Sequence, residues 1–171
     1  MGLGKTLQTV ATVEIISRRL TTNGVFLIIA PLSTLSHWER EFRRWTDLNT
    51  VVYHGSAEDR KTIREFEFAY EANRPKTGLG LNSLYLKKCR PRKFAVGERS
   101  WMVEVVITTP EMVVTDDFVE LTCVEWTGVI VDEAHRLKNH NSKLAVNLRD
   151  PRFTFRHIIL LTGTPIQNDV Q

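Results

Sequence analysis

The chain has 171 residues, of which 42% are apolar and 25% charged, with a formal net charge of +3. This composition is sufficient to bury a real core and predicts one soluble domain. The two cysteines lack metal-binding spacing and exclude a disulfide framework, which favours a reducing intracellular compartment. We expect no signal peptide and no membrane contact, because the longest apolar run, residues 25–30, has only the length of a strand.

The first third of the chain shows helical and strand patterns in alternation. Apolar residues recur at helical spacing from Lys5 to Leu20, which predicts a helix. The apolar run from Val25 to Ala30 predicts a buried strand that Pro31 ends. Ser33 or Thr34 can then cap a second helix.

That second helix has an apolar stripe, with arginines on its other faces. The stripe comprises Leu35, Trp38, Phe42 and Trp45. We expect both tryptophans to pack in the core rather than to stack on nucleotide bases. Residues 50–53 predict a short strand, and Ser56 with Asp59 predicts the start of a further helix. Its apolar side would carry Ile63, Phe66 and Tyr70.

The segment from residue 73 to residue 100 interrupts this regular pattern. Prolines and glycines break it repeatedly, and it carries a net charge of +7, which leaves −4 on the rest of the chain. A solvated surface loop is the favoured interpretation, and a nucleic-acid contact is the alternative.

Alternation resumes after residue 100. A strand is predicted at residues 103–108, and Thr109-Pro110-Glu111 has the residue order of a helix start. A buried strand follows at residues 128–131, then a helix capped by Asn141 that ends at Asp150-Pro151. The last strand is expected at residues 157–161. Strands that alternate with helices over the whole length predict an α/β fold with a parallel, doubly wound sheet.

Two adjacent carboxylates, Asp132 and Glu133, follow the buried strand at residues 128–131. Ligands bind at the carboxyl ends of strands in such a sheet. One carboxylate there can reach Mg²⁺ while its neighbour orients the attacking water of a phosphoryl transfer. The alternative is a buried strand that happens to end in an acidic turn.

The start of the chain, Met1 to Thr6, ends in Gly4-Lys5-Thr6, which is typical of the end of a phosphate-binding loop. Glycines allow backbone N–H groups to approach phosphates, the lysine meets the β and γ phosphates, and the threonine hydroxyl ligates Mg²⁺. The earlier glycine of the full pattern and the strand that feeds the loop would precede Met1. The joint occurrence with Asp132 and Glu133 favours a nucleotide site over chance.

Four ordered blocks resemble the motifs of the Swi/Snf-type chromatin-remodelling ATPases of helicase superfamily two. They are residues 1–6, residues 29–35 with 38–42, residues 132–139 and residues 160–168. Residues 38–42, 52–56 and 63–65 are most similar to the chromodomain-helicase-DNA-binding (CHD) remodellers, in their Kismet-like branch.

The resemblance implies ATP and Mg²⁺ as cofactors and assigns roles by position. The nucleotide-binding residues would be Gly2, Gly4, Lys5, Thr6, Asp132 and Glu133, with Thr6 and Asp132 as the Mg²⁺ ligands and Glu133, Asp132 and Lys5 as the catalytic residues. His135, Thr162, Gly163 and Thr164 would couple the γ-phosphate to movement between lobes. Pro31, Ser33, Thr34, Thr108 and Thr109 would contact DNA phosphates, with loop and cap chemistry as the alternative for these five.

The implied protein is a nuclear, DNA-dependent ATPase that translocates on duplex DNA and shifts nucleosomes, and this chain would be its first RecA-like lobe, without the first strand. The family pattern places a second lobe, with the arginines that stabilise the transferring phosphate, after Gln171. Such an arginine contributes about three to five orders of magnitude in rate, so the chain alone is expected to be a poor or inactive ATPase. The stretch from residue 76 to about residue 100 departs from the CHD pattern, as an insertion or as translated non-coding sequence.

Two other functions remain open at this point. A strand-separating helicase of the same superfamily shares the Asp-Glu-Ala-His motif, although the block from Pro31 to Phe42 argues against it. A catalytically inactive, truncated module that binds DNA or a protein partner is the hypothesis from a different class.

Overall fold

The computed structural model describes residues 4–19, 24–68, 102–115 and 118–163, without the side chains of Arg19 and Arg136. Four predicted features lie outside these residues: Gly2, Tyr70, the basic segment 73–100 and Thr164.

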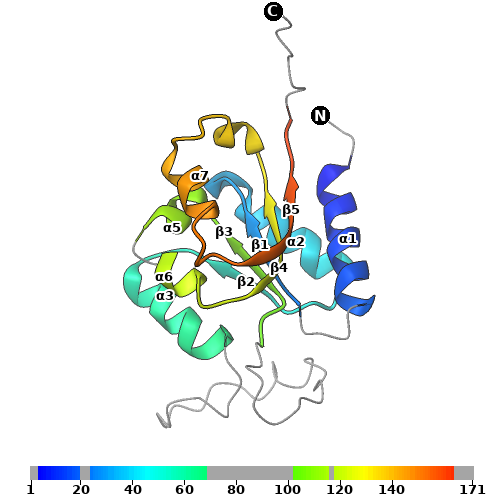
Figure 1. Ribbon diagram of the computed structural model, residues 1–171. Helices are drawn as coiled ribbons and strands as arrows, with labels where there is room; N and C mark the ends of the chain where they lie inside the picture. The colour runs from blue at the N-terminus through cyan, green and yellow to red at the C-terminus, as the bar shows by residue number, and fades with distance from the viewer. Residues whose placement is uncertain (1–3, 20–23, 69–101, 116–117, 164–171) are drawn as a thin grey trace, which may run out of the picture.

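The centre of the fold is a five-stranded sheet in which every neighbouring pair is parallel (Figure 1). Its strands are β1 Val25–Ile29, β2 Thr50–Tyr53, β3 Val105–Thr108, β4 Trp126–Val131 and β5 Phe155–Leu160. Their order in the sheet is β2-β3-β1-β4-β5. Because all the strands are parallel, each connection crosses from the end of one strand back to the start of the next. The predicted parallel α/β sheet is confirmed.

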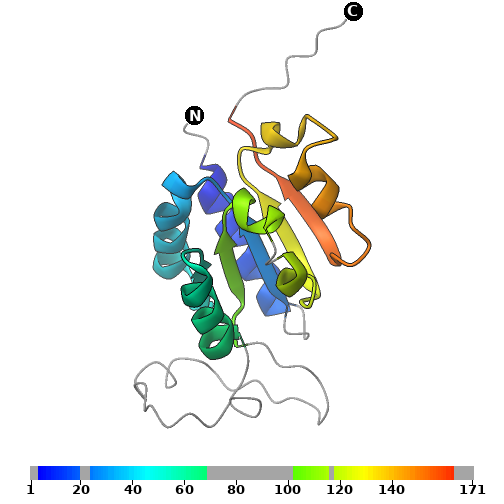
Figure 2. The same cartoon turned by 90° about the vertical axis from the view of Figure 1, so that its left-hand side faces the viewer.

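Helices cover both faces of this sheet. They are α1 Lys5–Arg19, α2 Leu35–Trp45, α3 Ala57–Ile63, α5 Pro110–Val114, α6 Phe118–Leu121 and α7 Lys143–Leu148. A π-helical turn, Arg64–Phe68, continues α3, and 3-10 turns occupy Leu32–Thr34 and Ala134–Leu137. Figure 2 shows α1 and α2 on one side of the sheet and α5 and α6 on the other.

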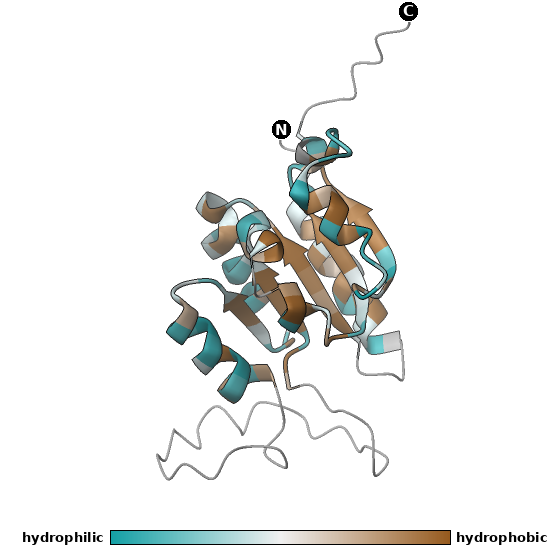
Figure 3. Ribbon diagram, turned by 60° about the vertical axis from the view of Figure 1, so that its left-hand side comes forward, coloured by the Kyte–Doolittle hydropathy of each residue, from teal (hydrophilic) through white to brown (hydrophobic). Residues whose placement is uncertain are grey.

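Two apolar clusters fix these layers to the sheet. Alternate residues of β1 point to opposite faces, so Phe26 and Ile28 pack with α1 and α2, whereas Leu27 and Ile29 pack with α5, α6 and α7. All residues of β1, β3 and β4 are buried, which explains their near-continuous apolar sequence. Figure 3 shows this concentration of hydrophobic residues in the strands.

Two predicted helix caps and one predicted core residue differ from the structure. Ser142, not Asn141, caps α7, because its Oγ accepts a hydrogen bond from the Ala145 N–H at 3.3 Å. Thr34 precedes α2 without capping it, and its hydroxyl donates to the Pro31 carbonyl at 2.9 Å. The prediction that both tryptophans of α2 are core residues is right for Trp38, which is 1% exposed, and wrong for Trp45, which is 52% exposed.

The predicted start of α3 is confirmed. The Ser56 hydroxyl accepts from the Asp59 N–H at 3.1 Å, and the Asp59 carboxylate accepts from the Ser56 N–H at 2.9 Å. The Ser56 hydroxyl also donates to Asp59 Oδ2 at 2.7 Å, and this hydrogen bond, together with that from the Ser56 N–H, lowers the pKa of Asp59. The helix α6 was not expected from the sequence.

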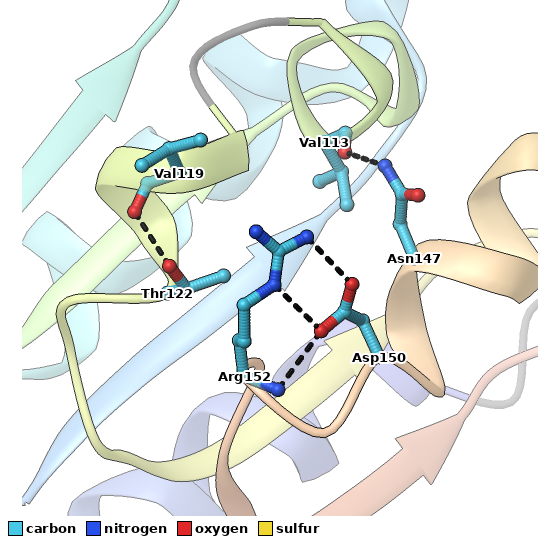
Figure 4. A network of polar contacts seen from close by, with 6 residues as sticks. All are labelled: Val113, Val119, Thr122, Asn147, Asp150 and Arg152. Atoms are coloured by element: carbon cyan, nitrogen blue, oxygen red, sulfur yellow. Dashed lines mark hydrogen bonds and ion pairs between the residues drawn. The ribbon is translucent and has the colours of Figure 1, made fainter.

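The turn between α7 and β5 is held by polar contacts, drawn in Figure 4. Arg152 donates from Nη2 to Asp150 Oδ2 at 2.8 Å and from Nε to Asp150 Oδ1 at 3.0 Å, which lowers the pKa of Asp150 to about 2. Asn147 Nδ2 donates to the Val113 carbonyl at 2.8 Å and thereby joins α7 to α5. Within the described part of the chain, no helix has the length and hydrophobicity needed to cross a membrane.

Candidate nucleotide site

The candidate site lies at the carboxyl ends of the central strands. The backbone N–H of Asp132 donates to the Ile29 carbonyl at 2.8 Å, so the pairing of β4 with β1 continues up to this carboxylate. The N–H of Ala134 donates to the Leu161 carbonyl at 2.7 Å, which ties the turn after β4 to the chain after β5. The two acidic residues therefore lie where the parallel sheet places its ligands, as predicted.

Both oxygens of the Asp132 carboxylate have hydrogen-bond donors. Oδ1 accepts from the backbone N–H of Glu133 at 2.9 Å, and Oδ2 accepts from the indole Nε1 of Trp38 at 3.1 Å. Each oxygen keeps a further lone pair. The carboxylate is thus held in one orientation and can still accept a cation.

Glu133 has an unusual backbone conformation. Its φ of 52° and ψ of 49° are left-handed, and among the described residues no other non-glycine residue has a positive φ. This conformation costs a residue with a Cβ about 1–2 kcal/mol. Its carboxylate Oε2 lies 3.1 Å from Nδ1 of His135, so the predicted catalytic residue and the predicted coupling residue are in contact.

Lys5 reaches the same place from the first turn of α1. Gly4, at φ +65°, makes the left-handed turn before the helix, and its carbonyl accepts from the Gln8 N–H at 2.9 Å. Lys5 Nζ donates to the carbonyl of Thr162 at 2.7 Å. The lysine therefore connects the start of α1 with the segment that follows β5, and Thr6 lies beside it in the first turn of α1.

Gly163 shows how closely these groups converge. A Cβ added at this glycine would lie 3.4 Å from Oε1 of Glu133 and 3.7 Å from Nζ of Lys5. A carboxylate and an ammonium from distant parts of the described chain thus border one small space, which a larger residue at position 163 would occupy.

The available donors fit Mg²⁺ held together with a phosphate. No group of three or more His, Cys, Asp or Glu side chains that could enclose a metal occurs in the part of the chain that is described. Mg²⁺ in nucleotide sites uses one or two carboxylates plus substrate phosphates and retains waters, and needs no complete protein cage. The oriented carboxylate of Asp132 and the hydroxyl of Thr6 match this requirement.

The residues predicted to contact DNA divide into two groups. Pro31, Ser33 and Thr34 form a turn at the carboxyl end of β1, in which Ser33 is exposed. Thr108 and Thr109 are both 0% exposed, and the Thr108 hydroxyl donates to the Tyr53 carbonyl at 2.8 Å. Thr108 ends β3 and Thr109 follows it as the residue before α5, so both side chains lie in the core and the predicted contact of these residues with DNA phosphates stays a prediction.

Trp38 also belongs to this site, although the sequence predicted it only as a core residue. A buried indole N–H requires an acceptor, and that requirement was the available signal.

Comparison with known proteins connects this geometry to a family. Residues 1–171 match the SNF2-related domain. The chain is 46% identical over 172 residues to mouse (Mus musculus) Chromodomain-helicase-DNA-binding protein 6, covering 100% of this chain and 6% of that protein. It is 44% identical over 172 residues to the human (Homo sapiens) Chromodomain-helicase-DNA-binding protein 7, covering all of this chain and 5% of that protein. The chain thus spans a small fraction of the length of these relatives.

Solved structures show the same fold. The SWI2/SNF2 ATPase core of Sulfolobus solfataricus in complex with dsDNA superposes with a TM-score of 0.65 at 27% identity, covering 99% of this chain and 27% of that chain. The same core domain described without DNA gives a TM-score of 0.62 at 26% identity, with the same coverage.

Proposed function

We propose that this chain, which belongs to the SNF2-related domain family, is the ATP-binding, RecA-like lobe of a DNA-dependent ATPase that remodels chromatin. The protein would use ATP and Mg²⁺ to translocate on duplex DNA and reposition nucleosomes in the nucleus. A second lobe would close over the nucleotide. The small fraction of the relatives' length that this chain covers makes these activities of the whole protein a proposal.

The observation that carries the proposal is the convergence of Lys5, Glu133 and Gly163 on one space. A lysine of a phosphate-binding loop needs to face the γ-phosphate, and the carboxylate that orients water must lie on the far side of that phosphate. Their common neighbour, Gly163, leaves room between them. A salt bridge with only a structural role would need no such space between the lysine and the carboxylate.

Each side chain then has a defined task. Lys5 would exchange the Thr162 carbonyl for phosphate oxygens, so nucleotide binding would break this contact between α1 and the segment after β5. Asp132 and Thr6 would hold Mg²⁺, which neutralises charge on the phosphates when bound. Glu133 orients the attacking water, and His135, at 3.1 Å, keeps that carboxylate in place.

The turn formed by Pro31, Ser33 and Thr34 would contact DNA. The turn lies at the same edge of the sheet as the nucleotide site, because β1 and β4 are parallel neighbours. Exposed hydroxyls and backbone N–H groups can bind phosphates without reading sequence. The structure from Sulfolobus solfataricus is described as a complex with dsDNA, which supports DNA as a ligand but does not say which residues contact it.

The first experiment measures binding of a fluorescent ATP analogue to the full chain in Mg²⁺. Lys5→Ala should weaken binding by about 10-fold to 100-fold, the range for loss of a hydrogen bond to a charged group. Lys143→Ala is the matched control, because Lys143 is exposed at the start of α7, and it should leave binding unchanged. Equal binding by wild type and Lys5→Ala would refute the proposed site.

The second experiment measures turnover in a protein that carries this chain together with a second lobe. Glu133→Gln should keep ATP bound and abolish DNA-stimulated hydrolysis. Translocation without strand separation on a duplex would support a remodeller, whereas strand separation would indicate a helicase. DNA binding without any nucleotide binding would favour the non-catalytic module.

A further inference from the structure

We propose that Trp38 is a positioning residue for Asp132, whose indole N–H fixes the carboxylate in the orientation that Mg²⁺ requires. The inference rests on the proposed function and deepens it, since it adds a residue from a helix that contributes no group to the phosphate-binding loop. Trp38 and Asp132 are 94 residues apart in the sequence and come from α2 and from the end of β4.

The indole ring is rigidly held. Trp38 is 1% exposed, and its ring stacks on that of Phe42 with centroids 6.3 Å apart and an interplanar angle of 28°. Phe42 is itself 0% exposed. The ring cannot rotate without disturbing the core between α2 and the sheet, so the direction of its N–H is set by packing.

The acceptor of that N–H is chemically specific. A buried indole can satisfy its donor with a backbone carbonyl, but Trp38 uses a carboxylate, 3.1 Å away. The other carboxylate oxygen accepts from the Glu133 N–H at 2.9 Å. Two fixed donors define the plane of the carboxylate, as the outer hydrogen-bond partners of metal ligands do.

Trp126 provides a matched comparison within the same chain. It is 0% exposed, and its Nε1 donates to the carbonyl of Leu121 at 3.0 Å. Replacing either tryptophan with phenylalanine removes one buried indole hydrogen bond and keeps an aromatic ring. Of the two replacements, Trp38→Phe is the one that releases Asp132.

The test is a Mg²⁺ titration of the full chain at a fixed concentration of a fluorescent ATP analogue, with binding rather than turnover as the readout. Trp38→Phe should raise the half-saturating Mg²⁺ concentration by about 10-fold to 100-fold, the range for loss of an outer-shell partner. Trp126→Phe should leave it unchanged. Thermal melts of both variants would verify that each is folded.

A second measurement needs no variant. In wild-type protein with ¹⁵N-labelled tryptophan, the indole N–H resonance of Trp38 should shift when Mg²⁺ and nucleotide are added together, and that of Trp126 should not. An unmoved Trp38 resonance, an unchanged Mg²⁺ requirement in Trp38→Phe, or equal changes in both variants would each overturn the assignment. If the wild type shows no Mg²⁺-dependent nucleotide binding, the proposed function fails and this inference fails with it.

Discussion

Gly128 is the position at which one added methyl group should test the packing behind the nucleotide site. This glycine lies in β4, and a Cβ placed on it would be 3.0 Å from Cδ1 and 3.1 Å from Cε1 of Phe26. Phe26 is 2% exposed and belongs to β1, which is hydrogen-bonded to a strand on each side. The ring therefore has little space into which it can retreat, and Gly128→Ala should destabilise the fold.

The size of the effect follows from two opposing terms. Overpacking a well-packed core costs about 1–3 kcal/mol. Alanine has fewer unfolded conformations than glycine, which returns about 0.4–1 kcal/mol. The net loss in free energy of unfolding should be about 1–2 kcal/mol, or roughly 2–8 °C in Tm for a domain of this size.

The assay is urea unfolding followed by circular dichroism, in wild-type and Phe26→Leu backgrounds. The smaller leucine leaves room for the new methyl group, so Gly128→Ala should cost less, or stabilise, in the Phe26→Leu background. An equal cost in both backgrounds would show that contact with the Phe26 ring is not the cause, and the reasoning would be wrong.

Three further predictions concern single residues. Glu133→Asn should raise the free energy of unfolding by up to about 1 kcal/mol, because asparagine tolerates the left-handed backbone at φ 52° better than glutamate. The same change should abolish ATP turnover in a protein that carries this chain together with a second lobe. A lower free energy of unfolding on chemical denaturation would contradict the first expectation. Ser56→Ala should remove the capping box of α3 and cost about 1 kcal/mol, seen as a lower urea midpoint, whereas Ser36→Ala on the exposed face of α2 serves as the control. Asp150→Asn should lower Tm at pH 6, and the difference in Tm from wild type should shrink as pH falls from about 4 towards 2. The pKa of Asp150 is lower in the folded state than in the unfolded state, so its stabilising contribution is present above the unfolded pKa and is lost when the carboxylate is protonated. A difference in Tm that stays constant down to pH 2 would exclude the Arg152 pair as its source.

The sequence predicted the sheet because each strand carries its own local signal. The apolar runs of β1 and β4 are buried on both faces, so no polar alternation interrupts them. The same reasoning located Asp132 and Glu133, since they directly follow such a run. The burial of Thr108 and Thr109 could not be predicted from the local sequence, because hydroxyl residues occur at strand ends both inside and outside a core.

Local sequence patterns could not predict contacts between segments that are distant in the chain. The apolar stripe of α2 correctly indicated that Trp38 is buried, but not that its N–H meets a carboxylate 94 residues away. Trp45 belongs to the same stripe, yet it lies at the end of α2, past the edge of the apolar cluster, where its indole donates to Glu41 at 3.0 Å instead. Asn141 and Ser142 are neighbouring residues with similar capping ability, and only the path of the chain decides between them.

The hydrogen bond from Lys5 to the Thr162 carbonyl has a consequence for the order of folding. It joins residues 157 positions apart, so the site closes almost the entire described chain into one loop. Synthesis delivers Lys5 long before Thr162, and the two can meet only after β5 has paired with β4 at the edge of the sheet. We therefore expect the nucleotide site of a nascent chain to be complete only after β5 has joined the sheet. ATP at 100 times its Kd would then stabilise the folded state by about 2.7 kcal/mol, because it binds the folded chain and not the unfolded one.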